Sequence, residues 1–421
     1  MTSLMKVKGR FRKYLKILGP GLVTGASDDD PSGIATYSQA GAGFGLVLLW
    51  MAPFTFPMMA AIQGMCARIG LVTSQGLTYT LKNHYPRPIL YLMIIFSVPA
   101  IILNIGADIA GMGAVTNLLF PSIPSFVFSL LFTIVLMAVI ILFSYKKIAD
   151  ILKWLCLSIL LYLIVPFLVK KDWKQVLIST FIPHIEWNKD FIEMVVAILG
   201  TTISPYLFFW QATMEAEDKE HNQTMVIVDK KILRNMAADV NSGMFASNLV
   251  MLFIILTTGV VLFNTGTRDI NTVDQAAKAL EPLAGRFSYI CFALGVIGTG
   301  FLAIPVLTGS LSYILAESFG WEEGLDKKFH EARAFYIVII LSLVIGLLIN
   351  VLGISPMKAL IFTAILYGVT SPVMIGVILH IGNNKKIMNE FTNSRLSNVL
   401  GIITFILMTI SAGILIYFQF K

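Results

Sequence analysis

Residues 19–33 read GPGLVTGASDDDPSG, and this stretch decides how the chain folds. It lies inside a long apolar region, yet it contains three consecutive acids, Asp28, Asp29 and Asp30, followed by Pro31. A regular lipid-facing helix cannot continue here, because proline lacks a backbone donor and carboxylates are costly to bury in a bilayer. The flanking segments, about 16–27 and 34–43, are each too short to span a membrane but together make one crossing. We therefore predict a transmembrane helix that breaks near Asp30.

A broken helix leaves backbone carbonyls without their hydrogen bonds, and such groups are tolerated within a membrane only against protein or a water-filled cavity. A carboxylate beside them makes an oxygen-rich cation site. The alternative is a solvated loop between two short hairpin segments. Adjacent like charges repel, so we expect at least one of Asp28 and Asp29 to face water. We assign these two acids at most a role in a vestibule.

The composition places the rest of the chain in the bilayer too. The chain is 57% hydrophobic and 13% charged, with a mean hydropathy of +0.80, whereas a soluble domain has about 25% charged residues. We predict an all-α polytopic membrane protein that forms one integral membrane domain over residues 1–421. Eleven spans are expected at about 16–43, 46–67, 88–112, 124–145, 149–169, 191–214, 236–263, 286–316, 333–351, 357–381 and 396–419. Two amphipathic stretches, 73–83 and 273–283, are predicted to be surface helices between spans.

Lys and Arg are distributed unevenly among the connections between these spans. The N-terminal tail carries Lys6, Lys8, Arg10, Arg12, Lys13 and Lys16, and later connections on the same side include Arg68, Lys82, Lys230, Lys327 and Lys385. By the positive-inside rule, the N-terminus is cytoplasmic and eleven spans leave the C-terminus extracytoplasmic, in a cell membrane. The basic excess is thus a topology signal, and nucleic-acid binding is not expected.

A second break is predicted in the sixth span. Residues 200–211 read GTTISPYLFFWQ, with Pro205 in the middle of an apolar segment. Interrupted helices at corresponding places in two halves indicate an inverted-repeat transporter whose substrate binds between the breaks. We therefore predict a LeuT-type 5+5 inverted repeat, with halves at about 16–169 and 191–381 and an eleventh helix at about 396–419.

Other polar residues also lie within the predicted spans. Asp108 is a lone carboxylate in an apolar helix, which favours a pathway or packing role inside the bundle. For most of the others a hydrogen bond between helices is the better interpretation; they are Asn104, Asn248, Asn350, Thr363, Tyr367 and Thr370. Gln211 and Glu215 follow the second break and either line an exit path or are solvated residues at a helix end.

At these positions the chain resembles the Nramp family of divalent metal transporters, whose first span carries a GPG motif and then DPGN. Here Gly19-Pro20-Gly21 and Asp30-Pro31-Ser32-Gly33 occupy the matching places, and the likeness continues through Gln39-Ala40-Gly41-Ala42 and Leu48-Leu49-Trp50. The resemblance implies a metal site made by Asp30, the carbonyl of Ser27 and the carbonyl of Thr201.

The chain departs from the family pattern at the implied site. Gly33 stands where the family has Asn, Ser204 where it has Met, and Tyr206 where it has His. Loss of the thioether favours hard cations such as Mg²⁺ and Mn²⁺, which prefer hydroxyl, carbonyl, carboxylate and water ligands. Gly33 and Ala364, the latter in place of a family Gln, open volume for an ion that keeps its waters.

The resemblance also bears on proton coupling. Gly111 and Ile101 occupy places where carboxylates are expected, and Tyr206 does not titrate near neutral pH as His would. We expect a transporter of Mg²⁺, and also Mn²⁺, that works by alternating access without proton coupling, as in the Nramp-related magnesium transporters. The alternatives are a proton-coupled Mn²⁺ or Fe²⁺ symporter and, less favoured, a sodium-coupled transporter of organic solutes. We expect a monomer in the lipid bilayer, with no cofactor and no enzymatic activity, since no nucleophile–base pair is evident.

Overall fold

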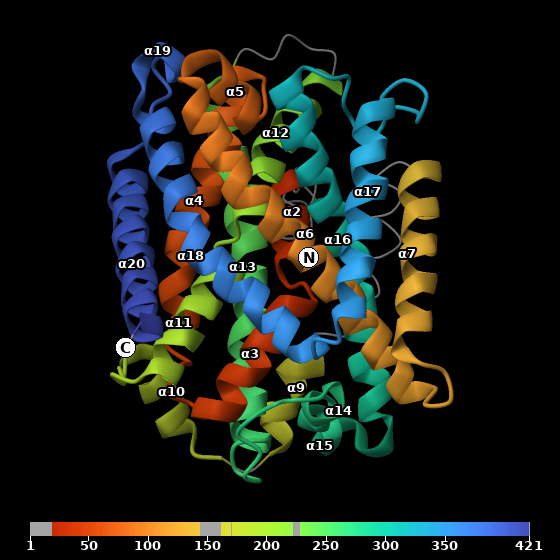
Figure 1. The fold of residues 1–421 in the computed structure, drawn as a ribbon. Coiled ribbons are helices and arrows are strands. Elements are labelled where there is room, and N and C mark those ends of the chain that lie inside the picture. The colour runs from red at the N-terminus through yellow and green to blue at the C-terminus, as the bar shows by residue number, and fades with distance from the viewer. Residues whose placement is uncertain (1–18, 144–160, 170, 222–227, 421) are drawn as a thin grey trace, which may run out of the picture.

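The computed structural model describes residues 19–143, 161–169, 171–221 and 228–420. These ranges are almost entirely helical and contain no β-strand (Figure 1). Nine segments within them are long and apolar enough to cross a membrane. They are α4 (Met51–Thr73), α6 (Arg87–Leu119), α7 (Ser125–Leu142), the pair α11 and α12 (Lys189–Asp218), α13 (Lys230–Val261), α16 (Ser288–Phe319), α17 with the turn after it (Arg333–Leu352), α18 (Pro356–Asn383) and α20 (Arg395–Phe420).

Both predicted helix breaks are confirmed. The first predicted span consists of α2 (Pro20–Asp28) and α3 (Pro31–Phe44), and the sixth consists of α11 (Lys189–Thr202) and α12 (Pro205–His221). A proline begins the second piece of each pair, because its missing N–H is harmless at a helix start and disruptive in a helix interior. The fifth predicted span, about 149–169, lies mostly outside the described residues, which include only its end as α9 (Leu161–Leu168).

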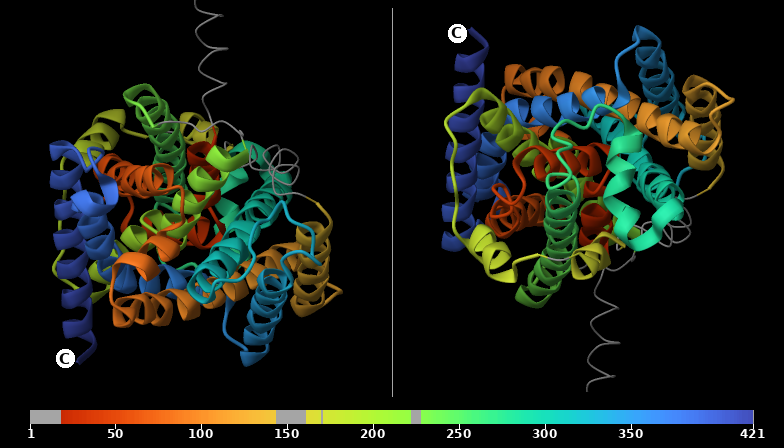
Figure 2. Two further views of the ribbon diagram at one scale, coloured as in Figure 1. Left: turned by 90° about the horizontal axis from the view of Figure 1, so that it is seen from above. Right: turned by 90° about the horizontal axis from the view of Figure 1, so that it is seen from below.

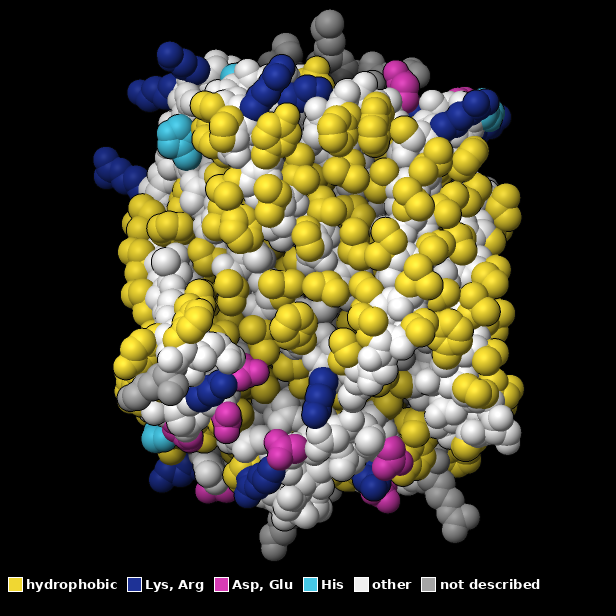
Figure 3. All heavy atoms as spheres, viewed as in Figure 1, with side chains coloured by type: hydrophobic (Ala, Val, Ile, Leu, Met, Phe, Trp, Pro, Cys, Tyr) yellow, Lys and Arg dark blue, Asp and Glu magenta, His cyan; other side chains and the backbone are white. Residues whose placement is uncertain are grey.

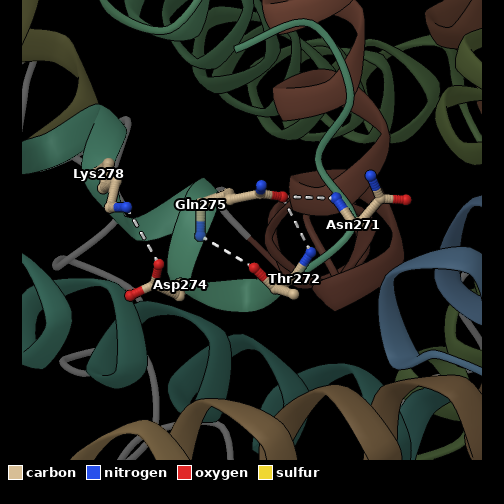
Figure 4. Close-up of polar contacts among 5 residues, drawn as sticks. All are labelled: Asn271, Thr272, Asp274, Gln275 and Lys278. Atoms are coloured by element: carbon tan, nitrogen blue, oxygen red, sulfur yellow. Dashed lines mark hydrogen bonds and ion pairs between the residues drawn. The ribbon is translucent and has the colours of Figure 1, made fainter.

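Short helices cap the two ends of the bundle. At one end lie α5 (Leu77–His84) and α19 (Lys385–Met388), and at the other lie α10 (Trp173–Phe181), α14 (Val273–Ala277) and α15 (Glu281–Ala284) (Figure 1). A capping box starts α14, in which Thr272 accepts from the Gln275 N–H and the Gln275 side chain accepts from the Thr272 N–H (Figure 4). The two predicted surface helices are therefore present.

The broken helices lie in the middle of the bundle, surrounded by longer helices (Figure 2). Helix α13 packs along both α2 and α3, and α18 packs along α11, α3 and α6. A Cβ atom on Gly25 would overlap the backbone of Gly243, so only glycine allows α2 and α13 to approach this closely. Helix α20 lies at the edge, against α18, α11 and α4.

The outer surface carries a wide hydrophobic band between two polar ends (Figure 3). Lys and Arg side chains gather at the end that carries α5 and α19, whereas acidic and basic side chains are mixed at the opposite end (Figure 3). This arrangement is the one expected of a polytopic membrane protein.

Candidate metal site between the two broken helices

Asp30 organises the first break. Its side chain caps α3, because one carboxylate oxygen accepts from the Gly33 N–H at 2.7 Å and from the Ser32 hydroxyl at 2.7 Å. A carboxylate is favourable there, since the first N–H groups of a helix have no partner within the helix. Asp30 is only 2% exposed, so this charge lies inside the bundle.

The second carboxylate oxygen of Asp30 connects the break to two other helices. It accepts from the Asn104 amide of α6 at 2.9 Å, and the Asn104 carbonyl oxygen accepts from the Thr363 hydroxyl of α18 at 2.9 Å. The sequence predicted hydrogen bonds between helices for Asn104 and Thr363, and this is confirmed. The link from Asn104 to Asp30 is an additional role that the sequence did not indicate.

Two hydroxyl groups bind backbone carbonyls at the second break, and one of them, that of Tyr206, reaches the first break. Ser204 donates to the carbonyl oxygens of Thr201 and Gly200, at 2.7 and 3.0 Å, and so occupies carbonyls that the end of α11 leaves free. Tyr206 donates to the Ser27 carbonyl oxygen at 3.0 Å. Both backbone carbonyls implied as metal ligands therefore carry a hydroxyl donor in this conformation.

Gly33 lies where the two breaks meet. A Cβ atom at this position would lie 3.4 Å from the Asp28 carbonyl oxygen, 3.4 Å from the Thr201 hydroxyl oxygen and 3.5 Å from an Asp30 carboxylate oxygen. These are ordinary contact distances, so a Cβ atom would fit at this position without moving the backbone. The structure thus brings Asp30, Ser27, Gly33, Thr201, Ser204 and Tyr206 together.

Asp28 and Asp29 lie on the α13 side of the break. The hydroxyl of Ser247 donates to Asp28 at 2.7 Å and approaches Asp29 at 3.4 Å. The expectation that at least one of them faces water is wrong in this conformation, since they are only 1% and 5% exposed. The close packing of α2 on α13 buries both acids.

Asp108 is fully buried on α6, one helical turn beyond Asn104. Neither of its carboxylate oxygens has a hydrogen-bond partner among the described residues. Over the same residues, no Lys, Arg or His forms an ion pair with Asp28, Asp29, Asp30 or Asp108. Buried carboxylates without cationic partners favour the binding of cations or protons.

Gln211 and Glu215 are buried further along α12 and bond to each other, with 3.0 Å between the Gln211 amide nitrogen and a Glu215 carboxylate oxygen. They are therefore not solvated residues at a helix end. The structure does not bring them into contact with Asp30.

The described residues contain no group of three or more Asp, Glu, His or Cys side chains able to hold a metal ion together. An ion near Asp30 would therefore rely on hydroxyl, amide and carbonyl oxygens and on water as its other ligands, which is the ligand set of hard cations.

Known proteins are similar to this chain in sequence and in fold. The family described as "Natural resistance-associated macrophage protein-like" matches residues 21–418. The divalent metal cation transporter MntH of Caldanaerobacter subterraneus is 27% identical, over 97% of this chain and 94% of that protein, and MntH of Yersinia enterocolitica is 23% identical, over 96% of each. The structure of the Eremococcus coleocola manganese transporter superposes with a TM-score of 0.77 at 18% identity, over 96% of this chain and 86% of that one. This likeness confirms the predicted fold class.

Proposed function

The chain belongs to the Nramp family, which matches it over residues 21–418, and we propose that it carries divalent metal cations across a membrane by alternating access. Relatives that align with nearly the whole chain are named divalent metal cation transporters, which supports this cargo. The family is one of membrane transporters and not of enzymes.

The observation that carries the proposal is the buried Asp30 carboxylate between two broken helices. It has no cationic partner among the described side chains, and the groups around it are hydroxyls, amides and carbonyls. A divalent cation would neutralise it there. Asp30 is the proposed direct ligand, and the Ser27 and Thr201 carbonyls with the Ser204 hydroxyl are proposed to hold the ion or its waters.

We propose Mg²⁺ as the preferred ion, with Mn²⁺ also transported. Three hydrogen bonds already fill most of the acceptor capacity of the Asp30 carboxylate, and hydroxyl groups donate to both candidate carbonyls. An ion that keeps several waters needs few direct ligands, and Mg²⁺ dehydrates reluctantly. Gly33 supports the same preference, because glycine provides no side-chain ligand and leaves that coordination position to water.

Competition in proteoliposomes tests the choice of ion. Mn²⁺ entry is followed with a fluorescent indicator in the lumen while Mg²⁺ or Ca²⁺ is added outside. We expect Mg²⁺ to inhibit Mn²⁺ entry in proportion to its concentration. Absence of Mg²⁺ competition, with Mn²⁺ transport intact, would contradict the magnesium proposal while leaving the metal transporter proposal in place.

We further propose that transport is not coupled to protons, since Gly111, Ile101 and Tyr206 stand where titratable family residues are expected. Proton-coupled Mn²⁺ or Fe²⁺ symport is the second candidate, and the unpaired buried carboxylate of Asp108 is the observation in its favour. A pH dye inside the same liposomes separates the two. Acidification of the lumen in step with metal entry would support symport, and a constant pH would support uncoupled transport.

A further inference from the structure

A cavity of about 280 Å³ lies between α4, α13 and α20, away from the helix breaks. Its wall is mostly apolar, and we call it the Arg68 groove. The apolar part includes Phe56, Ala60, Met236, Val240, Leu396 and Leu400. Leu396 is 69% exposed on the outer surface of α20, so the groove adjoins the face that contacts lipid in a polytopic membrane protein.

The polar lining of the groove is Arg68 with Asn241 and Ser397. The Arg68 guanidinium makes a single hydrogen bond among the described residues, a long one of 3.3 Å from Nη1 to the Thr392 carbonyl oxygen. Its Nε atom is buried without a partner, and no described carboxylate forms an ion pair with it. A partly buried guanidinium without a counter-charge is costly, so an anion bound beside Arg68 would be favourable.

The position of Arg68 indicates which anion fits. Arg68 lies in the last two turns of α4, five residues before Thr73, at the end of the bundle where Lys and Arg gather (Figure 3). Anionic lipids of the cytoplasmic leaflet bind basic pockets between transmembrane helices. A phosphate offers acceptor oxygens that match the forked donors of arginine, and an acyl chain matches the apolar wall beside it.

We propose that the Arg68 groove binds an anionic phospholipid, with the headgroup phosphate on Arg68 and one acyl chain between α4, α13 and α20. The lipid fills the space that separates the peripheral helix α20 from the core and supplies the acceptor that the Arg68 Nε lacks. Binding there is independent of the metal site, because the groove shares no residue with it.

Two variants of the full chain test the two halves of the proposal. Arg68→Gln removes the charge and shortens the side chain, whereas Gly64→Leu fills the apolar part and leaves Arg68 in place. A Cβ atom on Gly64 meets no other atom within 4 Å, so the second variant is expected to fold. The matched control is Arg395→Gln, which removes an exposed charge at the start of α20 outside the groove.

Each protein is purified in a mild detergent, supplied with an equimolar mixture of phosphatidylglycerol and phosphatidylethanolamine, and examined by native mass spectrometry. We expect wild type and Arg395→Gln to retain one phosphatidylglycerol. Arg68→Gln should retain about tenfold less, as expected for loss of a hydrogen bond to a charged group. Gly64→Leu should retain similarly little, because its side chain occupies the space of the acyl chain. Equal retention by wild type and both groove variants would overturn the proposal, as would equal retention of the zwitterionic lipid. Displacement of phosphatidylglycerol by inorganic phosphate at equal concentration would also overturn it, since the site would then be one for a free anion.

Discussion

At the scale of single residues, hydroxyl groups occupy the carbonyls that the two breaks set free. Tyr206 donates to Ser27, and Ser204 donates to Thr201 and Gly200. The breaks were predictable, because Pro31 and Pro205 interrupt apolar segments. The pairing of Tyr206 with Ser27 joins residues 179 positions apart, so it depends on tertiary packing that no local pattern contains.

Asp30→Asn tests whether the charge at the first break is required. The amide has nearly the same size and its oxygen can still accept the cap hydrogen bonds, so the fold should persist while attraction for a divalent cation is lost. We expect Mn²⁺ entry into proteoliposomes to fall at least about tenfold, since direct removal of a buried charged partner costs several kcal/mol. The control is Asp274→Asn, which breaks only the surface ion pair with Lys278. Asp30→Asn transport at the wild-type rate would exclude Asp30 as a ligand.

Ser204→Met tests the basis of ion selectivity. The substitution replaces a hydroxyl with a thioether, a soft ligand that favours later transition metals. We expect Cd²⁺ to gain and Mg²⁺ to lose strength as competitors of Mn²⁺ entry. Ser204→Ala is the matched control, because it also removes the hydrogen bonds to Thr201 and Gly200 but adds no sulfur. Identical selectivity of the two variants would mean that residue 204 does not contact the ion.

At the scale of helices, Asp239 of α13 holds the start of α2. Its carboxylate accepts from the backbone N–H groups of Gly19, Gly21 and Leu22 at 2.8, 2.7 and 3.2 Å. This contact could not be predicted from the sequence, because the usual capping signal lies within three residues of the helix start whereas Asp239 is 218 residues from Gly21. The same pairing of α2 with α13 buries Asp28 and Asp29.

Asp239→Ala is expected to destabilise the protein strongly. It leaves three backbone donors without their acceptor, and each buried donor that stays unpaired costs about 1–3 kcal/mol. Thermal unfolding in detergent, followed by tryptophan fluorescence, should show a clear fall in melting temperature. Asp229→Ala removes an exposed cap at the start of α13, which bonds the Ile232 N–H, and should have a much smaller effect. Equal shifts in the two variants would argue against a special role for Asp239.

Glu323, in the connection between α16 and α17, should make stability depend on pH. Burial, and then the nearby Glu317 and Glu217, raise its pKa to about 9, above the roughly 4.3 of an unfolded glutamate. Between these two pKa values the folded protein binds more protons than the unfolded chain. The contribution of Glu323 to the free energy of unfolding is therefore complete at low pH and is lost as pH rises through about 9. We expect Glu323→Gln to reduce the fall in melting temperature between pH 6 and pH 9.

The matched control for this pH dependence is Glu322→Gln. Lys327 lowers the pKa of Glu322, so that carboxylate is ionised throughout the range from pH 6 to pH 9. The control should therefore keep most of the wild-type slope, because Glu322 makes only a small contribution to the raised pKa of Glu323. A wild-type slope in Glu323→Gln would show that other groups set the pH dependence.

At the scale of the whole molecule, helix positions can be predicted from the sequence, because each membrane span must be a long apolar helix. Runs of apolar residues identified α4, α6, α7, α13, α16, α17, α18 and α20, with errors of up to seven residues at their bounds. The sequence did not predict which helices pack against each other, because an apolar helix face can contact lipid as well as another helix. Close contacts such as Gly25 on Gly243 become visible only in three dimensions.

We propose from the distribution of Lys and Arg that the end carrying α5 and α19 is cytoplasmic. Accessibility of introduced cysteines tests this orientation in a background without Cys66, Cys156 and Cys291. Lys386→Cys is exposed on α19, and Lys278→Cys is exposed beside α14 at the opposite end (Figure 1). A membrane-impermeant maleimide applied to intact cells should label position 278 at once and position 386 only after permeabilisation. The reverse pattern would invert the topology, and the Arg68 groove would then open to the outer leaflet, where its anionic lipid would be scarcer.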